Sequence, residues 1–226
     1  MKRMTIRKLA PILLIMCIVT LDSCIGVSAD ITMRRDGSGK IVMEYRFSRM
    51  AEVLGRLDGN ERWPIIPAGR ADFERSLERI PGMRLVSFSS REDASPNGAD
   101  KDIVNKAELE FRDIEALMTF LDPSGKRAVL SREGEKNRLS VSINDGVSSQ
   151  TNADLLDLLM QVSAGYELKL SFSAEGDCAL ALSDSAGNAV QPQGVQLVPS
   201  GKKVSLAMGT GDVISLRQGL TVDFLW

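Results

Sequence analysis

The chain has 226 residues, of which 43% are hydrophobic and 26% are charged, the balance of a globular protein that can bury a large core. Its formal net charge of −2 gives no basic excess for binding nucleic acid. It contains no histidine, which excludes Ser-His-Asp and Cys-His catalysis, HExxH metal sites and histidine pH switches.

The N-terminus has the anatomy of an export signal. Lys2, Arg3, Arg7 and Lys8 form a positive segment, and an apolar run from Leu9 to Leu21 follows it. A helix that spans a bilayer needs about 20 apolar residues, so this run is short for an anchor and predicts a secretory signal peptide. We expect an exported protein of the periplasm or cell envelope.

Two cleavage sites compete after this signal. Leu21-Asp22-Ser23-Cys24 is similar to a bacterial lipobox, although Asp22 stands where a small or apolar residue is usual. Cleavage there gives a signal peptide of residues 1–23 and a domain of residues 24–226, anchored to the membrane if Cys24 is lipidated. Small residues before Asp30 offer the alternative, a signal peptide of residues 1–29.

The first half of the domain predicts a hairpin, helices and two further strands. Residues 30–47 form the hairpin around the turn Asp36-Gly37-Ser38-Gly39. Apolar residues at helical spacing predict helices over 48–57 and 70–80 and another that begins after Asp113. Alternation predicts strands over 83–89 and 103–111, with a polar loop at 90–100 between them.

The second half is mostly strand. Residues 127–132 and 138–144 form a second hairpin, and residues 152–164 form a leucine-rich helix. Further strands are expected over 166–173, 177–183, 194–198, 203–208, 212–216 and 220–226. The pattern predicts a single mixed α+β domain of largely antiparallel sheet, with about four amphipathic helices and nine or ten strands.

Two apolar segments are candidate binding surfaces. The helix over 152–164 carries more apolar residues than one stripe needs, so it is either buried on most sides or lines an apolar groove. The candidate groove residues are Leu155, Leu156, Leu159 and Met160. The loop Trp63-Pro64-Ile65-Ile66 is a candidate partner contact through Trp63, Ile65 and Ile66, or else Trp63 covers an edge of the core.

The remaining chemistry is sparse. Cys178 shares an alternating face with two leucines, which favours a buried side chain over a reactive thiol. Acidic pairs such as Asp154 and Asp157 lie on predicted polar faces. No nucleophile, dinucleotide or metal motif is present. We expect no enzyme, no catalytic residue, no metal and no cofactor.

The layout resembles a known group of bacterial lipoproteins. An export signal followed at once by a strand, Asp36-Gly37-Ser38-Gly39 and a second strand is similar to the LppM-like group, as is the segment from Leu109 through Phe111 to Leu117. The layout also resembles spirochaetal lipoproteins of unassigned function. The resemblance implies a mixed α/β envelope domain that handles lipids or glycolipids, without catalytic residues.

Two functional hypotheses follow. The first is a non-enzymatic exported envelope lipoprotein that binds a lipid or glycolipid. The second is a structural or assembly protein that docks an envelope partner through an exposed loop or a sheet edge. A deep apolar pocket would support the first hypothesis, and a fully packed interior would count against it.

Overall fold

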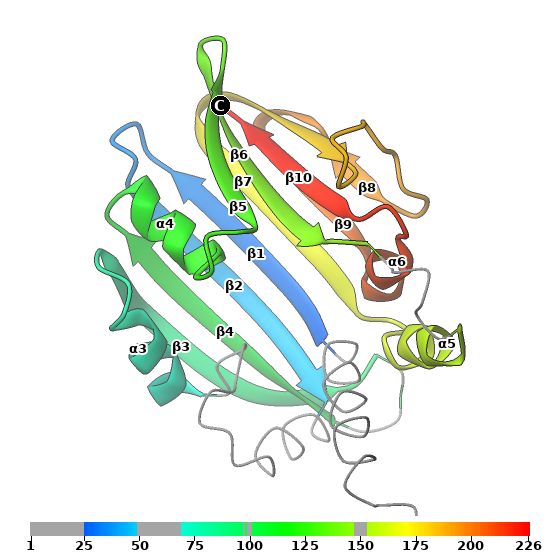
Figure 1. The fold of residues 1–226 in the computed structure, drawn as a ribbon. Coiled ribbons are helices and arrows are strands. Elements are labelled where there is room, and N and C mark those ends of the chain that lie inside the picture. Colours follow the sequence, from blue (N-terminus) through cyan, green and yellow to red (C-terminus); the bar gives the residue numbers. More distant parts are fainter. Residues whose placement is uncertain (1–24, 49–68, 97, 99–100, 147–152) are drawn as a thin grey trace, which may run out of the picture.

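A computed structural model describes residues 25–48, 69–96, 98, 101–146 and 153–226. The strands are β1 Ile25–Met33, β2 Gly39–Ser48, β3 Met83–Ala94, β4 Lys101–Phe111, β5 Ala128–Glu133, β6 Lys136–Asn144, β7 Glu167–Ser183, β8 Gln196–Val198, β9 Ser200–Gly209 and β10 Leu220–Leu225. The helices are α3 Arg70–Leu77, α4 Ile114–Leu121, α5 Ala153–Val162 and α6 Thr210–Ser215. Figure 1 shows their arrangement.

All ten strands belong to one mixed sheet. Its order is β3-β4-β2-β1-β7-β10-β6-β5, with β9 paired to β7 and β8 paired to β9. The β1–β7 ladder is parallel, and the other ladders are antiparallel. The fold is therefore α+β with a largely antiparallel sheet, as the sequence predicts.

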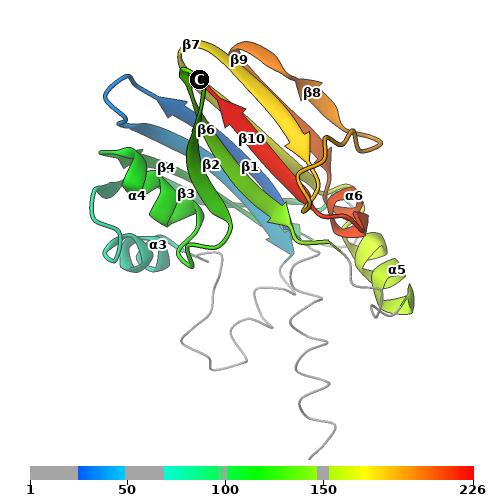
Figure 2. The same cartoon turned by 45° about the horizontal axis from the view of Figure 1, so that its top comes forward.

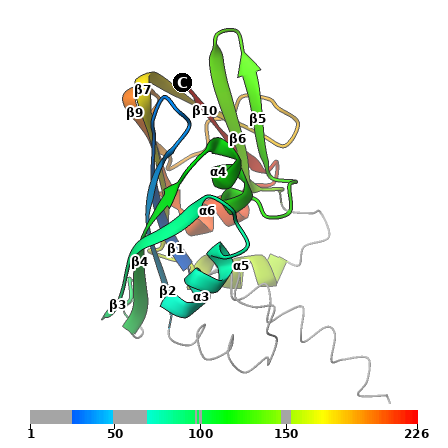
Figure 3. The same ribbon diagram turned by 90° about the vertical axis from the view of Figure 1, so that its left-hand side faces the viewer.

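The sheet divides along the long strand β7. The first part of β7 pairs with β1 over residues 168–173, and its last part pairs with β10 over residues 179–183. Because β9 pairs with both parts of β7, β1 and β10 share the opposite edge of β7 one after the other. The place where β1 ends and β10 begins to pair with β7 is called the fork below. Figures 2 and 3 show how β5, β6 and β10 diverge from β1, β2 and β4 beyond it.

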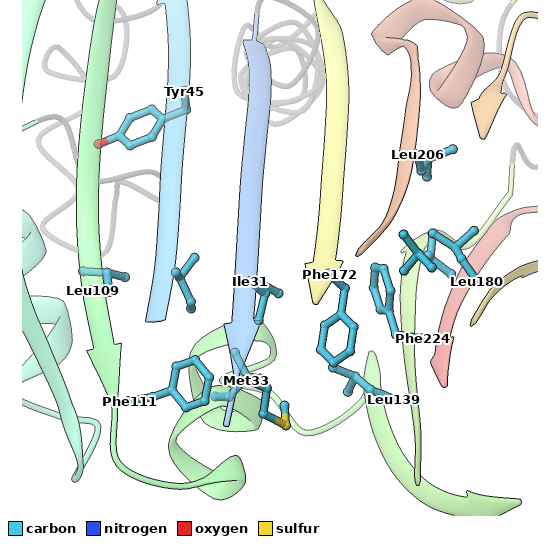
Figure 4. Close-up of a cluster of buried hydrophobic side chains, with 14 of the residues drawn as sticks. Ile31, Met33, Tyr45, Leu109, Phe111, Leu139, Phe172, Leu180, Leu206 and Phe224 are labelled. Carbon is cyan, nitrogen blue, oxygen red and sulfur yellow. The ribbon is translucent and has the colours of Figure 1, made fainter. Parts of the chain in front are cut away.

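The core lies on the face of the sheet that carries α3 and α4 (Figure 3). Alternation in β4 buries Leu109 and Phe111 and leaves Glu108 and Glu110 on the other face. Helices α3 and α4 each bury two side chains. Strands on both sides of the fork contribute to one cluster (Figure 4): Ile31, Met33, Tyr45, Leu109, Phe111, Leu139, Phe172, Leu180, Leu206 and Phe224.

Ion pairs between strands cover part of the opposite face. Lys203 Nζ lies 2.5 Å from Asp30 Oδ2, and Arg91 Nη2 lies 3.4 Å from Glu44 Oε2. These side chains are largely exposed, so each pair adds little to stability. The face is a hydrated surface with both charge signs.

Several sequence predictions need correction. The expected strand over 212–216 is wrong, since Thr210–Ser215 forms the short helix α6. The expected loop at 90–100 begins only after Ala94, because β3 continues to pair with β4. The two strands predicted over 166–183 are the single strand β7.

The expectation of about four amphipathic helices is also not supported. Three of the predicted helices occur, as α3, α4 and α5. The fourth, over 48–57, lies outside the described residues. The remaining described helix, α6, has six residues and was not predicted.

Candidate functional site

Most of the predicted site residues cannot be placed. Cys24, Trp63, Ile65 and Ile66 lie outside the described residues. Leu155 and Leu159 fall on α5, but only the side chains of Leu156 and Met160 are described among the four groove candidates. Leu156 is half-buried, and Met160 is 40% exposed. The apolar groove along α5 therefore stays a prediction.

A groove opens instead at the fork. It is open to solvent and has a volume of about 340 Å³. It is lined by Met33, Arg34, Arg35, Gly37, Ile114, Leu130, Asn137, Ala174, Glu175 and Trp226. These residues come from the β1–β2 turn, the start of α4, the β5–β6 hairpin, the middle of β7 and the last residue of the chain. The groove exists because the two parts of the sheet separate here.

Trp226 lines the groove and belongs to an aromatic cluster that extends into the core. The ring of Trp226 lies 5.1 Å from that of Phe172, which lies 5.2 Å from that of Phe224. Two backbone hydrogen bonds fix Trp226 to Asn137, with N–O distances of 3.1 Å and 2.9 Å. Phe172 is fully buried, whereas Trp226 is half-buried. Trp226 is therefore fixed in place and partly open to the groove.

The β1–β2 turn forms one rim. Asp36 Oδ1 accepts hydrogen bonds from the backbone N–H of Ser38 at 3.0 Å and from its hydroxyl at 2.6 Å. These bonds lower the pKa of Asp36 below its usual value. Gly37 has a φ of 81°, which completes the turn and which other residues rarely adopt. Arg34 and Arg35 are thereby held at the mouth of the groove.

Two aspartates hold the elements on the other side. Asp113 Oδ1 accepts a hydrogen bond from Ala116 N at 2.9 Å and caps α4, so that Ile114 begins the helix at the groove. Asp122 accepts hydrogen bonds from the backbone N–H groups of Ser124 and Ala128, at 3.1 Å and 2.9 Å.

The Asp122 contacts also fix the start of β5. The Ser124 hydroxyl and the backbone N–H of Arg127 donate to the same carboxylate. Together these bonds lower the pKa of Asp122 well below its usual range, with the Ser124 hydroxyl as the largest cause. Asp122 therefore sets the position of β5 and of Leu130 within it.

The opposite end of the sheet contains a closed polar cluster. Arg46 Nε lies 3.1 Å from Asp102 Oδ2, an ion pair whose geometry is not that of a hydrogen bond. Tyr166 donates from its hydroxyl to Asp102 Oδ1 at 2.9 Å, and Ser95 Oγ lies 3.1 Å from the same hydroxyl. Arg46 Nη2 also donates to Ala94 O at 2.9 Å. The Asp102 side chain is fully buried, so this cluster joins strand ends inside the protein.

A second buried carboxylate lies on β10. Asp223 is 3% exposed and accepts hydrogen bonds from Ser140 Oγ at 2.5 Å and from Arg138 Nη2 at 3.0 Å. The Asp223 carboxylate raises the pKa of Arg138. This cluster ties β10 to β6 through side chains as well as through the backbone.

Cys178 lies in the core. It is 1% exposed, which confirms the prediction of a buried side chain. Burial raises the pKa of its thiol, so the thiolate that a reactive cysteine needs is disfavoured.

A shallow depression of about 380 Å³ lies between residues 190–192 and 216–219. Within the described ranges, no group of three acidic or cysteine side chains could hold a metal ion. No helix in the same ranges is long and apolar enough to cross a bilayer.

Neither a protein-family profile nor a curated protein sequence matches the chain. The folded domain of the Mycobacterium tuberculosis LppM protein, solved by NMR, has a related structure with 14% identity and a TM-score of 0.43 over 88% of each chain. The expected resemblance to the LppM-like group thus has a partial counterpart in three dimensions.

The sequence analysis did not find the groove. Its residues are spread from Met33 to Trp226, and they meet only because β1 and β10 share one edge of β7. Two signals were present in the sequence. Arg34 and Arg35 stand directly before a turn, and Trp226 ends an alternating strand. Without the order of the strands, neither signal shows that these residues lie close together.

Proposed function

We propose that the chain is an exported, non-enzymatic envelope protein that is anchored to the membrane through an acylated Cys24. The observation that carries this proposal is that residues 25–29, which lie between the two candidate cleavage sites, belong to β1 and pair with β2. Cleavage before Cys24 leaves the whole strand in the mature domain. Two or more acyl chains on this residue suffice for stable anchoring.

The competing cleavage site would damage the fold. Cleavage after Ala29 would remove Ile25–Ala29 from β1, a strand that pairs with β2 on one side and β7 on the other. The lost segment includes Gly26, where an added Cβ would lie only 3.1 Å from the Arg46 side chain. The removed residues thus belong to closely packed structure, which favours the site before Cys24.

Metabolic labelling with an alkyne analogue of palmitate in a bacterial host tests the anchor. We expect labelling of the natural chain, loss of the label in Cys24→Ser and retention of the label in the matched control Cys178→Ser. Mass spectrometry of the mature protein should place its N-terminus at Cys24. A mature N-terminus at Asp30, or a label that persists in Cys24→Ser, would contradict the proposal.

The non-enzymatic part of the proposal rests on where the buried carboxylates lie. Asp102 and Asp223 are each held by an arginine and by hydroxyl groups within the sheet. Neither lines the groove at the fork. These two buried carboxylates therefore stabilise the fold.

We further propose that the domain binds a lipid or glycolipid. The groove at the fork supports this, because it joins apolar lining residues to a polar rim. The predicted apolar surface of α5, formed by Leu155, Leu156, Leu159 and Met160, is a second candidate position for an acyl chain.

Native mass spectrometry of residues 24–226, prepared with Cys24→Ser and without detergent, tests ligand binding. An added mass that disappears after organic extraction is the expected result. A protein mass without any addition, both after purification and after incubation with a total lipid extract of the source membrane, would contradict lipid binding.

The alternative function is docking of an envelope partner, and one sheet edge favours it. Strand β5 is an edge strand with two adjacent exposed apolar residues, Val129 at 57% and Leu130 at 41%. The loop with Trp63, Ile65 and Ile66 is the other candidate contact. Capture of a membrane partner by the natural chain but not by Trp63→Ala or Val129→Asp would support docking, and equal capture by all three would remove both surfaces.

A further inference from the structure

At the fork, one apolar side chain on the core face of the sheet, that of Leu130, is not covered by other residues. Leu130 pairs across the β5–β6 hairpin with Leu139, so the two side chains lie on the same face of the sheet. Leu139 is fully buried, whereas Leu130 is 41% exposed and lines the groove. A large apolar side chain that opens into a concave space, beside the half-buried Trp226, is a feature of ligand sites.

The rim of the groove carries an arginine that forms no direct ion pair with a described residue. Arg35 Nε lies 2.5 Å from Glu175 Oε2, so the charges of these two rim residues offset each other. Arg34 donates a hydrogen bond to Ser38 Oγ at 3.2 Å and forms no ion pair with any described residue. The nearby Asp36 carboxylate interacts with Arg34 electrostatically, but it accepts its hydrogen bonds from Ser38. The Arg34 guanidinium is therefore in direct contact with no described carboxylate.

The groove lies at the end of β1 that is opposite Cys24. Eight steps along an extended strand separate Ile25 from Met33, a span of roughly 26 Å. Lipids of a bilayer that holds the acyl chains of Cys24 would therefore lie at the other end of the strand.

We propose that this groove binds a single-chain anionic amphiphile, either a long-chain carboxylate or an alkyl phosphate. Its head group pairs with the Arg34 guanidinium, and its chain lies over Leu130 and Trp226. The site is preformed, because the Asp36 turn fixes Arg34 and two backbone hydrogen bonds fix Trp226. This inference deepens the proposed lipid binding by naming its site and its ligand class.

Fluorescence of a single tryptophan tests the proposal directly. The chain contains two tryptophans, so Trp63→Phe leaves Trp226 as the only reporter. The protein is residues 24–226 with Cys24→Ser, which keeps every strand of the sheet and needs no detergent. We expect 11-bromoundecanoate to quench Trp226 saturably, and dodecanoate or dodecyl phosphate to reverse the quenching. The stronger competitor of the two identifies the head group.

Matched variants separate charge from apolar contact. Arg34→Gln should weaken binding about tenfold, because it removes a charge-assisted hydrogen bond, whereas Arg91→Gln on the ion-paired face should leave it unchanged. Leu130→Glu should abolish binding, whereas Val198→Glu, which changes a side chain that is 50% exposed on β8, should not. Thermal unfolding of each variant confirms that it is folded.

Three results would overturn the assignment. One is the absence of saturable quenching by either class of anion. Another is equal binding of 11-bromoundecanol with no effect of Arg34→Gln, which would reduce the groove to an apolar patch. The third is equal competition by inorganic phosphate, which would make the site one for a free anion. None of these results affects the anchor at Cys24, since the palmitate labelling tests that separately.

Discussion

The two ends of the sheet each place an arginine near an aromatic residue, but in opposite environments. At the end where β1 begins, Arg46 lies beside the fully buried Asp102, which also accepts a hydrogen bond from Tyr166. At the fork, Arg34 lines an open groove with Trp226, donates a hydrogen bond to Ser38 and forms no direct ion pair with a described residue. The first arrangement is closed by protein groups, and the second has room for a ligand.

The comparison shows that residue type alone does not identify a site. A buried ion pair is costly to form and costly to break, so removing one partner destabilises the fold. An exposed arginine without a carboxylate contributes little to folding and is available for binding. The two ends should therefore respond differently to mutation.

Asp102→Ala should have the largest effect on folding. It leaves the Arg46 guanidinium and the Tyr166 hydroxyl without their buried acceptor, which we expect to lower the free energy of unfolding by about 3 kcal/mol. Urea denaturation measures the change. The control is Asp93→Ala, because Asp93 is half-exposed and 3.9 Å from Arg46, with an expected loss below about 0.5 kcal/mol. Equal losses in the two variants would show that the buried Asp102 carboxylate contributes no more to the free energy of unfolding than the exposed Asp93 carboxylate.

Tyr166→Phe should have an intermediate effect. The ring stays in place, but the hydroxyl that joins Asp102 to Ser95 is lost. We expect a loss of about 1 kcal/mol in the free energy of unfolding, measured in the same urea series. Additive losses in the double variant with Asp102→Ala would argue against a shared cluster, since coupled residues give a smaller combined loss.

Low pH should destabilise the end of the sheet that carries the groove, because aspartates that accept hydrogen bonds there become protonated. The pKa values of Asp36, Asp113 and Asp122 are lowered in the folded state, so their contribution is present above about pH 4 and is lost as the pH falls through the folded-state values. The urea concentration at the midpoint of unfolding should stay constant between pH 7 and pH 5. It should decrease when the pH is lowered below 4. Asp122→Asn should flatten this drop. The idea fails if the midpoint of the Asn variant falls as steeply as that of the natural chain.

Arg34→Gln should have the smallest effect on folding. Its guanidinium donates one hydrogen bond to Ser38, so the free energy of unfolding should change by less than about 0.5 kcal/mol. The same variant should weaken amphiphile binding about tenfold, as argued above. A large loss of stability would mean that Arg34, like Arg46, serves the fold, and would erase the difference between the two ends.

Local signals in the sequence predicted turns, caps and strand faces correctly where the structure depends on residues close together in the chain. The turn at Asp36-Gly37 and the cap at Asp113 occur as predicted, because each depends on contacts within a few residues. Alternation placed the buried residues of β4 correctly. Burial of Cys178 followed from the same alternation.

Predictions failed where distant contacts decide the local structure. Residues 210–215 form α6 because they pack against α5, where Gly211 brings the backbone close to Ser163. Strand β7 continues through the predicted break because Gly176, with a φ of 110°, allows an irregularity without ending the strand. Alternating apolar residues in a short segment do not distinguish a helix from a strand, or a strand that ends from one that continues through an irregularity.

The sequence by itself predicted an export signal with two candidate cleavage sites, and it determined the absence of histidine chemistry and the α+β class, because these depend on composition and local periodicity. Only the tertiary structure decided that residues 25–29 belong to β1 and that β10 follows β1 along β7. That order brings Arg34, Leu130 and Trp226 to one groove. Strand order depends on pairing between residues far apart in the chain, and no local pattern encodes it.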